Sequence, residues 1–293
     1  MTAMQQTLFS PVSVYGVGLH SGSQVRIHIY PERQNAGIYF VRTDVAPPVV
    51  IPASCEYVVA TKLATTLGRG EHQVSTVEHL MAAFYAMGID NARVEIDGPE
   101  VPVLDGSSAS FTMLMKDAGI VKQDAPRREL IITRPISIVD GDRFIKMLPA
   151  SGYEIDFTIE FDHKLLSSQQ ATYAIDQETF EREISRSRTF AFKRDVDYLR
   201  SIGLAKGGSL ENAVVIDDYK VMNVHGLRYK DEFVRHKILD CVGDLALCGA
   251  RIRGKVVASK SGHELNNRLC RTMVAQEMGA DACRVGLAAI SLP

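Results

Sequence analysis

The sequence predicts an α+β fold made of two similar domains. Strand-like alternation is interspersed with helical periodicity, and the order of these elements in the first half of the chain recurs in the second half. The chain of 293 residues is also long for one core and comfortable for two. A polar, proline-containing passage at 121–129 resembles a linker, so we expect domains at 1–124 and 125–293.

The first half begins with strands and continues with two helices. Apolar residues recur at every second position in 24–32 and 37–43, which is the pattern of a half-buried strand. Residues 75–88 change to helical spacing, and Gly88 is placed to end that helix. Alternation returns at 91–98, and 107–119 predicts a helix that starts with serines and ends at Gly119.

The second half repeats this order around an insertion. Strands are expected within 129–139, 143–149 and 153–162, and helices within 176–188, 230–249 and 261–279. Residues 192–217 combine a short amphipathic helix, a Gly-Gly turn and an apolar strand. We interpret this segment as an insertion on the sheet, and inserted loops often carry binding sites.

Composition excludes several classes of protein. Hydrophobic residues make up 46% and charged residues 23%, which argues against disorder and fibrous repeats. A net charge of -2 without a basic run argues against nucleic acid as a partner. The sequence has no signal peptide pattern and no run of about 18 apolar residues, so we expect a cytoplasmic protein without stable membrane insertion. Five cysteines without a C-x-x-C pair argue against a disulfide framework, and Cys241 and Cys248 are expected in the core.

A polar stripe crosses the apolar helix expected at 230–249. His236, Asp240 and Asp244 follow one another at intervals of four residues, and near a core they need solvent or a cation as partner. His236 and Asp240 can hold one metal ion, and a third ligand would leave a tetrahedral position for water, as in catalytic zinc sites. This spacing is not specific, and an exposed pair on a solvated face is the alternative.

The stretch "STVEHLMAAF" at 75–84 offers the third ligand. His79 begins a helix that packs on a core, and Glu78 beside it supplies a carboxylate. The inverted zinc-protease motif H-x-x-E-H is broken because Ser75 occupies its first position. Ser75 and Glu78 also have the S-x-x-E spacing of a capping box, so a purely structural role stays open.

Two further histidines are candidates. His263 follows a glycine turn, and pairing with Asp244 would favour its protonated form and make it a general acid. The same pairing occurs in ordinary surface networks. His20 lies in "YGVGLHSG" at 15–22, which is not a G-x-G-x-x-G motif, so a tight turn is the default interpretation.

Together these motifs resemble the UDP-3-O-acyl-N-acetylglucosamine deacetylases, the bacterial zinc amidases of lipid A synthesis. The resemblance runs in order through essentially the whole chain, in "GVGLHSG", "ATTLG", "TVEHLMAAF", "DGPEVPVLDGSS", "SRTFAF", "GLAKGGSLENAVV", "RYKDEFVRHKILDCVGDLAL" and "SGHELNN". It implies two similar α+β domains, each with a sheet covered by helices, and an active site in the cleft between them.

The resemblance also implies roles for particular residues. It assigns Zn2+ to His79, His236 and Asp240, and makes Glu78 the general base on water. It implies further catalytic roles for His263 as general acid, Asp244 as its orienting carboxylate, Thr189 at the oxyanion and Lys237 as an active-site lysine. The expected substrate contacts are Leu63, Phe190, Leu199, Gly207 and His20.

The implied reaction is hydrolysis of the N-acetyl group of UDP-3-O-(3-hydroxyacyl)-N-acetylglucosamine, the committed step of lipid A biosynthesis. We expect a monomer, and ligation by two histidines and an aspartate accepts iron as well as zinc. Two alternatives stay open: a metallopeptidase, which shares every ligand, and a non-catalytic binding module. The apolar segment 192–217 favours an acyl chain, because a peptide would require unpaired strand edges.

Overall fold

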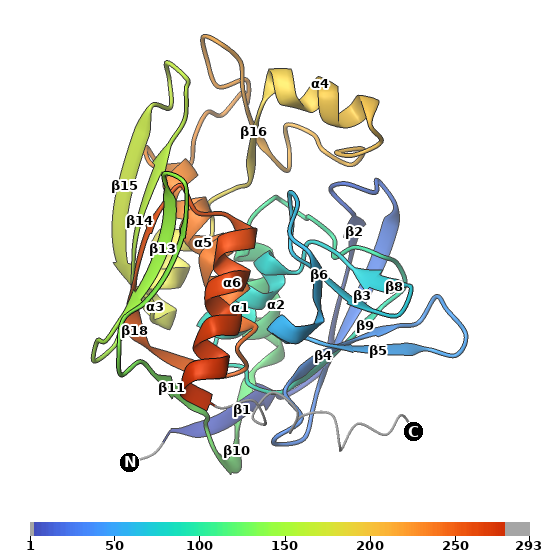
Figure 1. Cartoon of the computed structure of the whole chain (residues 1–293). Helices are drawn as coiled ribbons and strands as arrows, with labels where there is room; N and C mark the ends of the chain where they lie inside the picture. Colours follow the sequence, from blue (N-terminus) through green and yellow to red (C-terminus); the bar gives the residue numbers. More distant parts are fainter. Residues whose placement is uncertain (1–2, 279–293) are drawn as a thin grey trace.

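The computed structural model describes residues 3–278, so the end of the expected second domain, 279–293, lies outside the described residues. Two β-sheets enclose a layer of helices (Figure 1). This arrangement confirms the predicted α+β class. The four helices of the layer are α1 (Glu78–Ala86), α2 (Ala109–Ala118), α5 (Glu232–Ala246) and α6 (His263–Met273).

The two large sheets have the same topology. The first has the order β2 (Val12–Val17), β3 (Gln24–Pro31), β9 (Ala92–Ile96), β4 (Ile38–Arg42), β5 (Val49–Pro52). The second has the order β12 (Ile136–Asp140), β13 (Arg143–Leu148), β18 (Arg251–Ser259), β14 (Tyr153–Glu160), β15 (Ser168–Ala174). In both, the third and fourth strands are parallel and the other neighbours are antiparallel. The suggested structural duplication is therefore confirmed, with β11 (Glu129–Ile131) added beside β18.

Alternation explains how these strands share one core with the helices. In β14, Ile155, Phe157 and Ile159 are buried while the residues between them are partly exposed. In contrast, all nine residues of α1 are buried, because α1 is covered on several sides. Most buried apolar side chains of both sheets and of the helix layer belong to one hydrophobic cluster, which includes Cys241 and Cys248 as expected, while Tyr39, Val41 and Val50 of the first sheet belong to a second, small cluster.

The segment predicted as a linker is instead a strand. Residues Ile120–Pro126 form β10, which pairs antiparallel with β1 (Met4–Leu8). Lys122 and Asp124 are exposed, whereas Gln123 and Ala125 between them are covered. The sequence did not predict this strand, because one of its inward positions is the polar Gln123 and the alternation of apolar and polar residues is broken there. The Gln123 side chain accepts a hydrogen bond from Asn91 at 2.7 Å.

The insertion lies at one end of the molecule and has the elements expected of it. Here β16 (Phe190–Phe192) leads into α4 (Lys193–Ser201), and β17 (Val214–Ile216) follows the Gly207-Gly208 turn. The strand β17 pairs in parallel with β16 and does not join a large sheet. The smaller elements are η1 (Cys55–Tyr57), β6 (Val58–Ala60), β7 (Thr66–Arg69), β8 (His72–Val74), α3 (Gln177–Thr179), η2 (Phe180–Ile184) and η3 (Val274–Met278).

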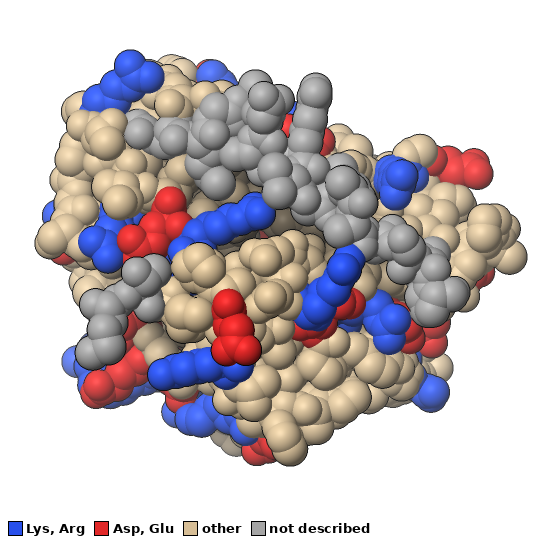
Figure 2. Space-filling view, turned by 90° about the horizontal axis from the view of Figure 1, so that it is seen from below, with Lys and Arg blue, Asp and Glu red and all other residues tan. Residues whose placement is uncertain are grey.

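Acidic and basic side chains are interspersed on the described part of the face shown in Figure 2, as the small net charge of -2 leads one to expect. Among residues 3–278 we find no helix with both the length and the apolar character needed to cross a membrane.

Candidate metal and proton-transfer site

The start of α1 orients Glu78 and His79 toward the centre of the molecule. The helix begins at Glu78, and the preceding residue, Val77, makes no side-chain cap. The capping-box alternative is wrong, because Glu78 is the first helical residue and cannot act from the third position. The Ser75 hydroxyl lies 3.0 Å from that of Thr66, and both Glu78 and His79 are buried.

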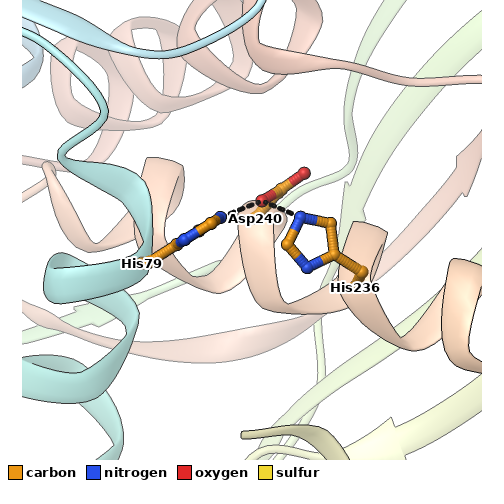
Figure 3. Close-up of side chains that lie close together, drawn as sticks. All are labelled: His79, His236 and Asp240. Carbon is orange, nitrogen blue, oxygen red and sulfur yellow. Dashed lines mark ion pairs between the residues drawn. The ribbon is translucent and has the colours of Figure 1, made fainter. Parts of the chain in front are cut away.

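A glycine lets α5 approach this helix start closely. A Cβ added at Gly243 would lie 2.0 Å from the backbone oxygen of Glu78, so only glycine fits between the two helices without displacement. His236 and Asp240, on the preceding turns of α5, are both buried. The close approach brings these side chains to His79, as Figure 3 shows.

His79, His236 and Asp240 converge on one point. Asp240 Oδ1 lies 3.6 Å from His79 Nε2 and 3.3 Å from His236 Nε2. Ligands about 2.1 Å from a tetrahedral ion are about 3.4 Å apart, so both separations fit a shared zinc ion. The three ligand atoms all lie within 4.8 Å of one another, which meets the distance condition for a metal-binding group.

The surroundings prepare these atoms for a cation. The Nδ1 of His236 lies 3.1 Å from the Ser187 carbonyl oxygen; donation there leaves Nε2 with its lone pair directed to the centre. Lys237 donates to Asp240 Oδ2 at 2.7 Å, while Oδ1 is buried without a hydrogen-bond partner among the described residues. Burial lowers the pKa of His236 to about 4, so its imidazole is neutral at pH 7. The donor set therefore fits a divalent cation.

A second group of polar residues, centred on Asp244, adjoins the metal-binding group. Asp244 Oδ2 lies 2.9 Å from His263 Nδ1 and accepts a hydrogen bond from Asn266 at 2.8 Å. Burial lowers the pKa of His263, but the charge and hydrogen bond of Asp244, aided by Glu78 and Asp240, outweigh burial and raise that pKa to about 9. His263 is therefore an imidazolium at pH 7 and can donate a proton.

Glu78 is suited to accept a proton. Burial raises the pKa of its carboxyl group, and the neighbouring imidazoles of His263 and His79 oppose that rise in part. A carboxylate whose proton affinity is raised is a better acceptor for a proton from water. Glu78 and His263 thus form a candidate base and acid in one buried group.

A cavity of about 310 Å³ lies beside α4. Phe190 lines the cavity, and its ring centroid is 6.3 Å from that of His236. Gly207, one of the predicted substrate contacts, does not line the cavity. It packs against Gly18, where a Cβ added at Gly207 would lie 2.2 Å from the Gly18 backbone oxygen. The other predicted residues that line the cavity are His20, Leu63, Thr189 and Leu199.

Sequence reasoning missed several residues that hold this site. Thr65 contacts both Glu78 and Asp244, and Asn266 contacts Asp244. Glu100 accepts hydrogen bonds from the backbone amides of His20 and Ser21 and so fixes the glycine-rich turn. All three residues lie in strings that carry the resemblance, "ATTLG", "DGPEVPVLDGSS" and "SGHELNN", but none of the three has a spacing that would assign it a role.

Comparison with known proteins identifies the family. The profile of the family described as UDP-3-O-acyl N-acetylglycosamine deacetylase matches residues 5–275. A protein of Myxococcus xanthus (strain DK1622) named UDP-3-O-acyl-N-acetylglucosamine deacetylase is 52% identical over 92% of this chain and 86% of its own length. Proteins of the same name from Anaeromyxobacter dehalogenans (strain 2CP-C) and Shewanella violacea are 48% and 49% identical over 96% and 93% of this chain, and 91% and 90% of their own. The chain therefore belongs to the UDP-3-O-acyl-N-acetylglucosamine deacetylase family.

Proposed function

We propose that this protein hydrolyses the N-acetyl group of UDP-3-O-(3-hydroxyacyl)-N-acetylglucosamine and releases acetate and a free amine, the step that commits material to lipid A. The family and the names of its relatives support the reaction class. The observation that carries the proposal is the convergence of His79, His236 and Asp240 beside Glu78 and the Asp244–His263 pair.

The proposed cofactor is Zn2+, held by the two imidazole Nε2 atoms and by Asp240 Oδ1. Asp240 Oδ1 is buried and has no hydrogen-bond partner within residues 3–278, and this atom and the two separations of 3.3 and 3.6 Å support the assignment. A bound Zn2+ supplies Lewis acidity, which polarises an amide carbonyl and makes water easier to deprotonate. Lys237 holds the other oxygen of Asp240 and so fixes the carboxylate plane.

Glu78 acts as the general base in this proposal. It takes a proton from the water that attacks the amide carbon, and its raised pKa matches that task. The Thr189 hydroxyl is proposed to donate to the oxyanion that develops on the carbonyl oxygen.

His263 acts as the general acid. An amide nitrogen cannot leave as an anion, so it must receive a proton as the carbon–nitrogen bond breaks. The imidazolium of His263 supplies this proton, and Asp244 orients the ring through Nδ1 at 2.9 Å. Because Glu78 must be ionised while His263 is protonated, we expect a bell-shaped pH profile for kcat/KM.

The cavity beside α4 is the proposed binding site for the acyl chain. Leu63, Phe190 and Leu199 give it an apolar lining, and His20 and Thr189 lie among its polar groups. Gly207 supports the wall by packing on the glycine-rich turn. The split into domains 1–124 and 125–293, the cytoplasmic location and the monomeric state stay predictions from the sequence.

The test measures acetate released from the acylated UDP-N-acetylglucosamine, with an N-acetylated peptide as the competing substrate. We expect release from the nucleotide sugar alone. Glu78→Ala should keep its zinc while losing on the order of 100-fold in rate. Zinc content measured by elemental analysis should fall in His79→Ala, His236→Ala and Asp240→Ala. Full zinc occupancy in all three would reject the metal site, and peptide cleavage alone would reject the substrate.

A further inference from the structure

We propose that Thr65 is a positioning residue that fixes the base Glu78 and the acid pair Asp244–His263 relative to each other. The inference rests on the proposed function, since it takes Glu78 and His263 as the proton-transfer groups. Thr65 is 1% exposed and lies between Leu63, whose φ is +68°, and the strand β7. Thr65 does not line the cavity and is not one of the three metal-binding residues, so its role is indirect.

Two groups of this one residue reach two helices from different halves of the chain. The backbone amide of Thr65 donates to Glu78 Oε2 at 3.0 Å, at the start of α1. Its hydroxyl donates to Asp244 Oδ1 at 2.5 Å, on α5. The Thr65 carbonyl oxygen in turn accepts from the amide of Val77 at 3.3 Å, which secures the loop to the residue before α1. Thr65 therefore links the base Glu78 directly to Asp244, the carboxylate that orients the acid His263.

The hydroxyl also decides how Asp244 faces His263. Asp244 Oδ2 lies 2.9 Å from His263 Nδ1 and accepts a hydrogen bond from Asn266 Nδ2 at 2.8 Å. Asp244 Oδ1 accepts a hydrogen bond from the Thr65 hydroxyl at 2.5 Å. Donors on both oxygens prevent rotation of the carboxylate, because rotation would leave a buried oxygen unpaired. The imidazole is thereby held with its other nitrogen, Nε2, free to act on substrate.

The same hydrogen bond moderates the proton affinity of His263. The groups that face His263 are Asp244 and Asp240 from α5, Glu78 from α1 and the His20 ring from the glycine-rich turn. A donor on Asp244 draws negative charge away from the oxygen that meets the imidazolium. Without the hydroxyl, Asp244 attracts the proton on His263 more strongly, and His263 becomes a weaker acid.

The test compares Thr65→Val, which removes the hydroxyl but keeps the amide, with Thr65→Ser, which keeps both donors. Thr66→Val is the matched control, because it deletes the neighbouring hydroxyl, which contacts Ser75 and not Asp244. The His263 ring is titrated by NMR in the metal-loaded protein with 13C-labelled histidine. Thr65→Val should raise the pKa of His263 by about 0.5 to 1 unit, the scale of one hydrogen bond. Thr65→Ser and Thr66→Val should match the wild type.

A kinetic measurement gives a second readout. In Thr65→Val, kcat should fall about 10-fold with little change in KM, and the alkaline limb of the kcat/KM profile should move to higher pH. If Thr65→Val does not fold, Thr65→Ala makes the same deletion in a smaller side chain. An unchanged His263 pKa in whichever of these variants folds would overturn the proposal. The NMR titration needs no turnover, so a wild-type protein that releases no acetate would defeat the proposed function and leave this test intact.

Discussion

Gly243→Ala tests whether the close approach of α1 and α5 builds the metal site. The new Cβ would lie 2.0 Å from the backbone oxygen of Glu78 and 2.7 Å from its carbonyl carbon. An ordinary carbon–oxygen contact is about 3.3 Å, so one of the two helices has to move by about 1 Å. Both atoms of Glu78 belong to backbone, which cannot yield as the end of a flexible side chain would.

Two effects of this substitution oppose each other. Alanine improves helix propensity by about 1 kcal/mol over glycine. Overpacking a buried contact costs about 1–3 kcal/mol, occasionally more, and a clash with backbone belongs at the upper end. We therefore expect a net loss of about 2 kcal/mol. Metal–ligand distances tolerate only about 0.2 Å, so a 1 Å shift of His79 from Asp240 should lower zinc affinity on the order of 10-fold or more.

Urea unfolding of the metal-free protein and zinc competition with a chelator measure the two effects separately. Gly152→Ala is the control, because an added Cβ there meets no heavy atom within 4 Å and the residue is exposed. A Gly243→Ala variant with the urea midpoint and the zinc affinity of the wild type would show that the close approach of α1 and α5 does not build the metal site. A loss of stability with unchanged zinc affinity would show that the helices separate without disturbing the ligands.

Three further predictions concern other parts of the molecule. Glu232→Gln should cost about 3–5 kcal/mol in urea unfolding, because it leaves the buried Arg188 guanidinium without its counter-charge; a cost below about 1 kcal/mol would contradict this. The pKa of His263 is raised to about 9 from 6.5, so its charged form stabilises the fold fully below pH 6.5 and loses that effect as the pH rises to 9. The stability difference between wild type and His263→Gln should shrink over that interval, and a constant difference would refute it. Leu199→Trp should raise KM for long-chain substrates more than for short-chain ones, since Leu199 lines the cavity; equal effects would place the chain elsewhere.

Much of the fold was predictable because its strands and helices bury regular faces. The recurrence of strands and helices indicated a duplication, and the matching strand orders confirm it. Prediction failed where a distant partner decides local structure. The helix expected over 176–188 ends at Ile184 within η2, and Arg188 instead bonds to Glu232 on α5, 44 residues away. Local spacing holds no signal for that pairing.

The candidate site was predictable to a different extent for each of its parts. The i, i+4 spacing of His236 and Asp240 was compatible with a shared ion but also with an exposed pair on a solvated helix face, and it is their burial that favours the ion. His79 was a candidate third ligand from its own helix, but the sequence did not show that this helix meets α5, because the close approach depends on Gly243, which looks like any glycine in a helix pattern. The role of Thr65 could not be predicted for a similar reason, because its two contacts are with residues 13 and 179 positions away.

The duplication explains why the site lies where it does. In each half, the helix that precedes the central strand faces the middle of the molecule: α1 before β9 and α5 before β18. These equivalent helices pack against each other between the two sheets (Figure 1). Each contributes a histidine at the contact, and α5 adds Asp240 one turn later. A sheet packs on the outer side of each of these two helices, so the proposed ligands are held by rigid elements. A metal site requires such rigidity, because its ligand atoms must stay within a few tenths of an ångström of their positions. The two helices already hold Glu78 and Asp244 in place, so the loop that contains Thr65 needs only to align their side chains.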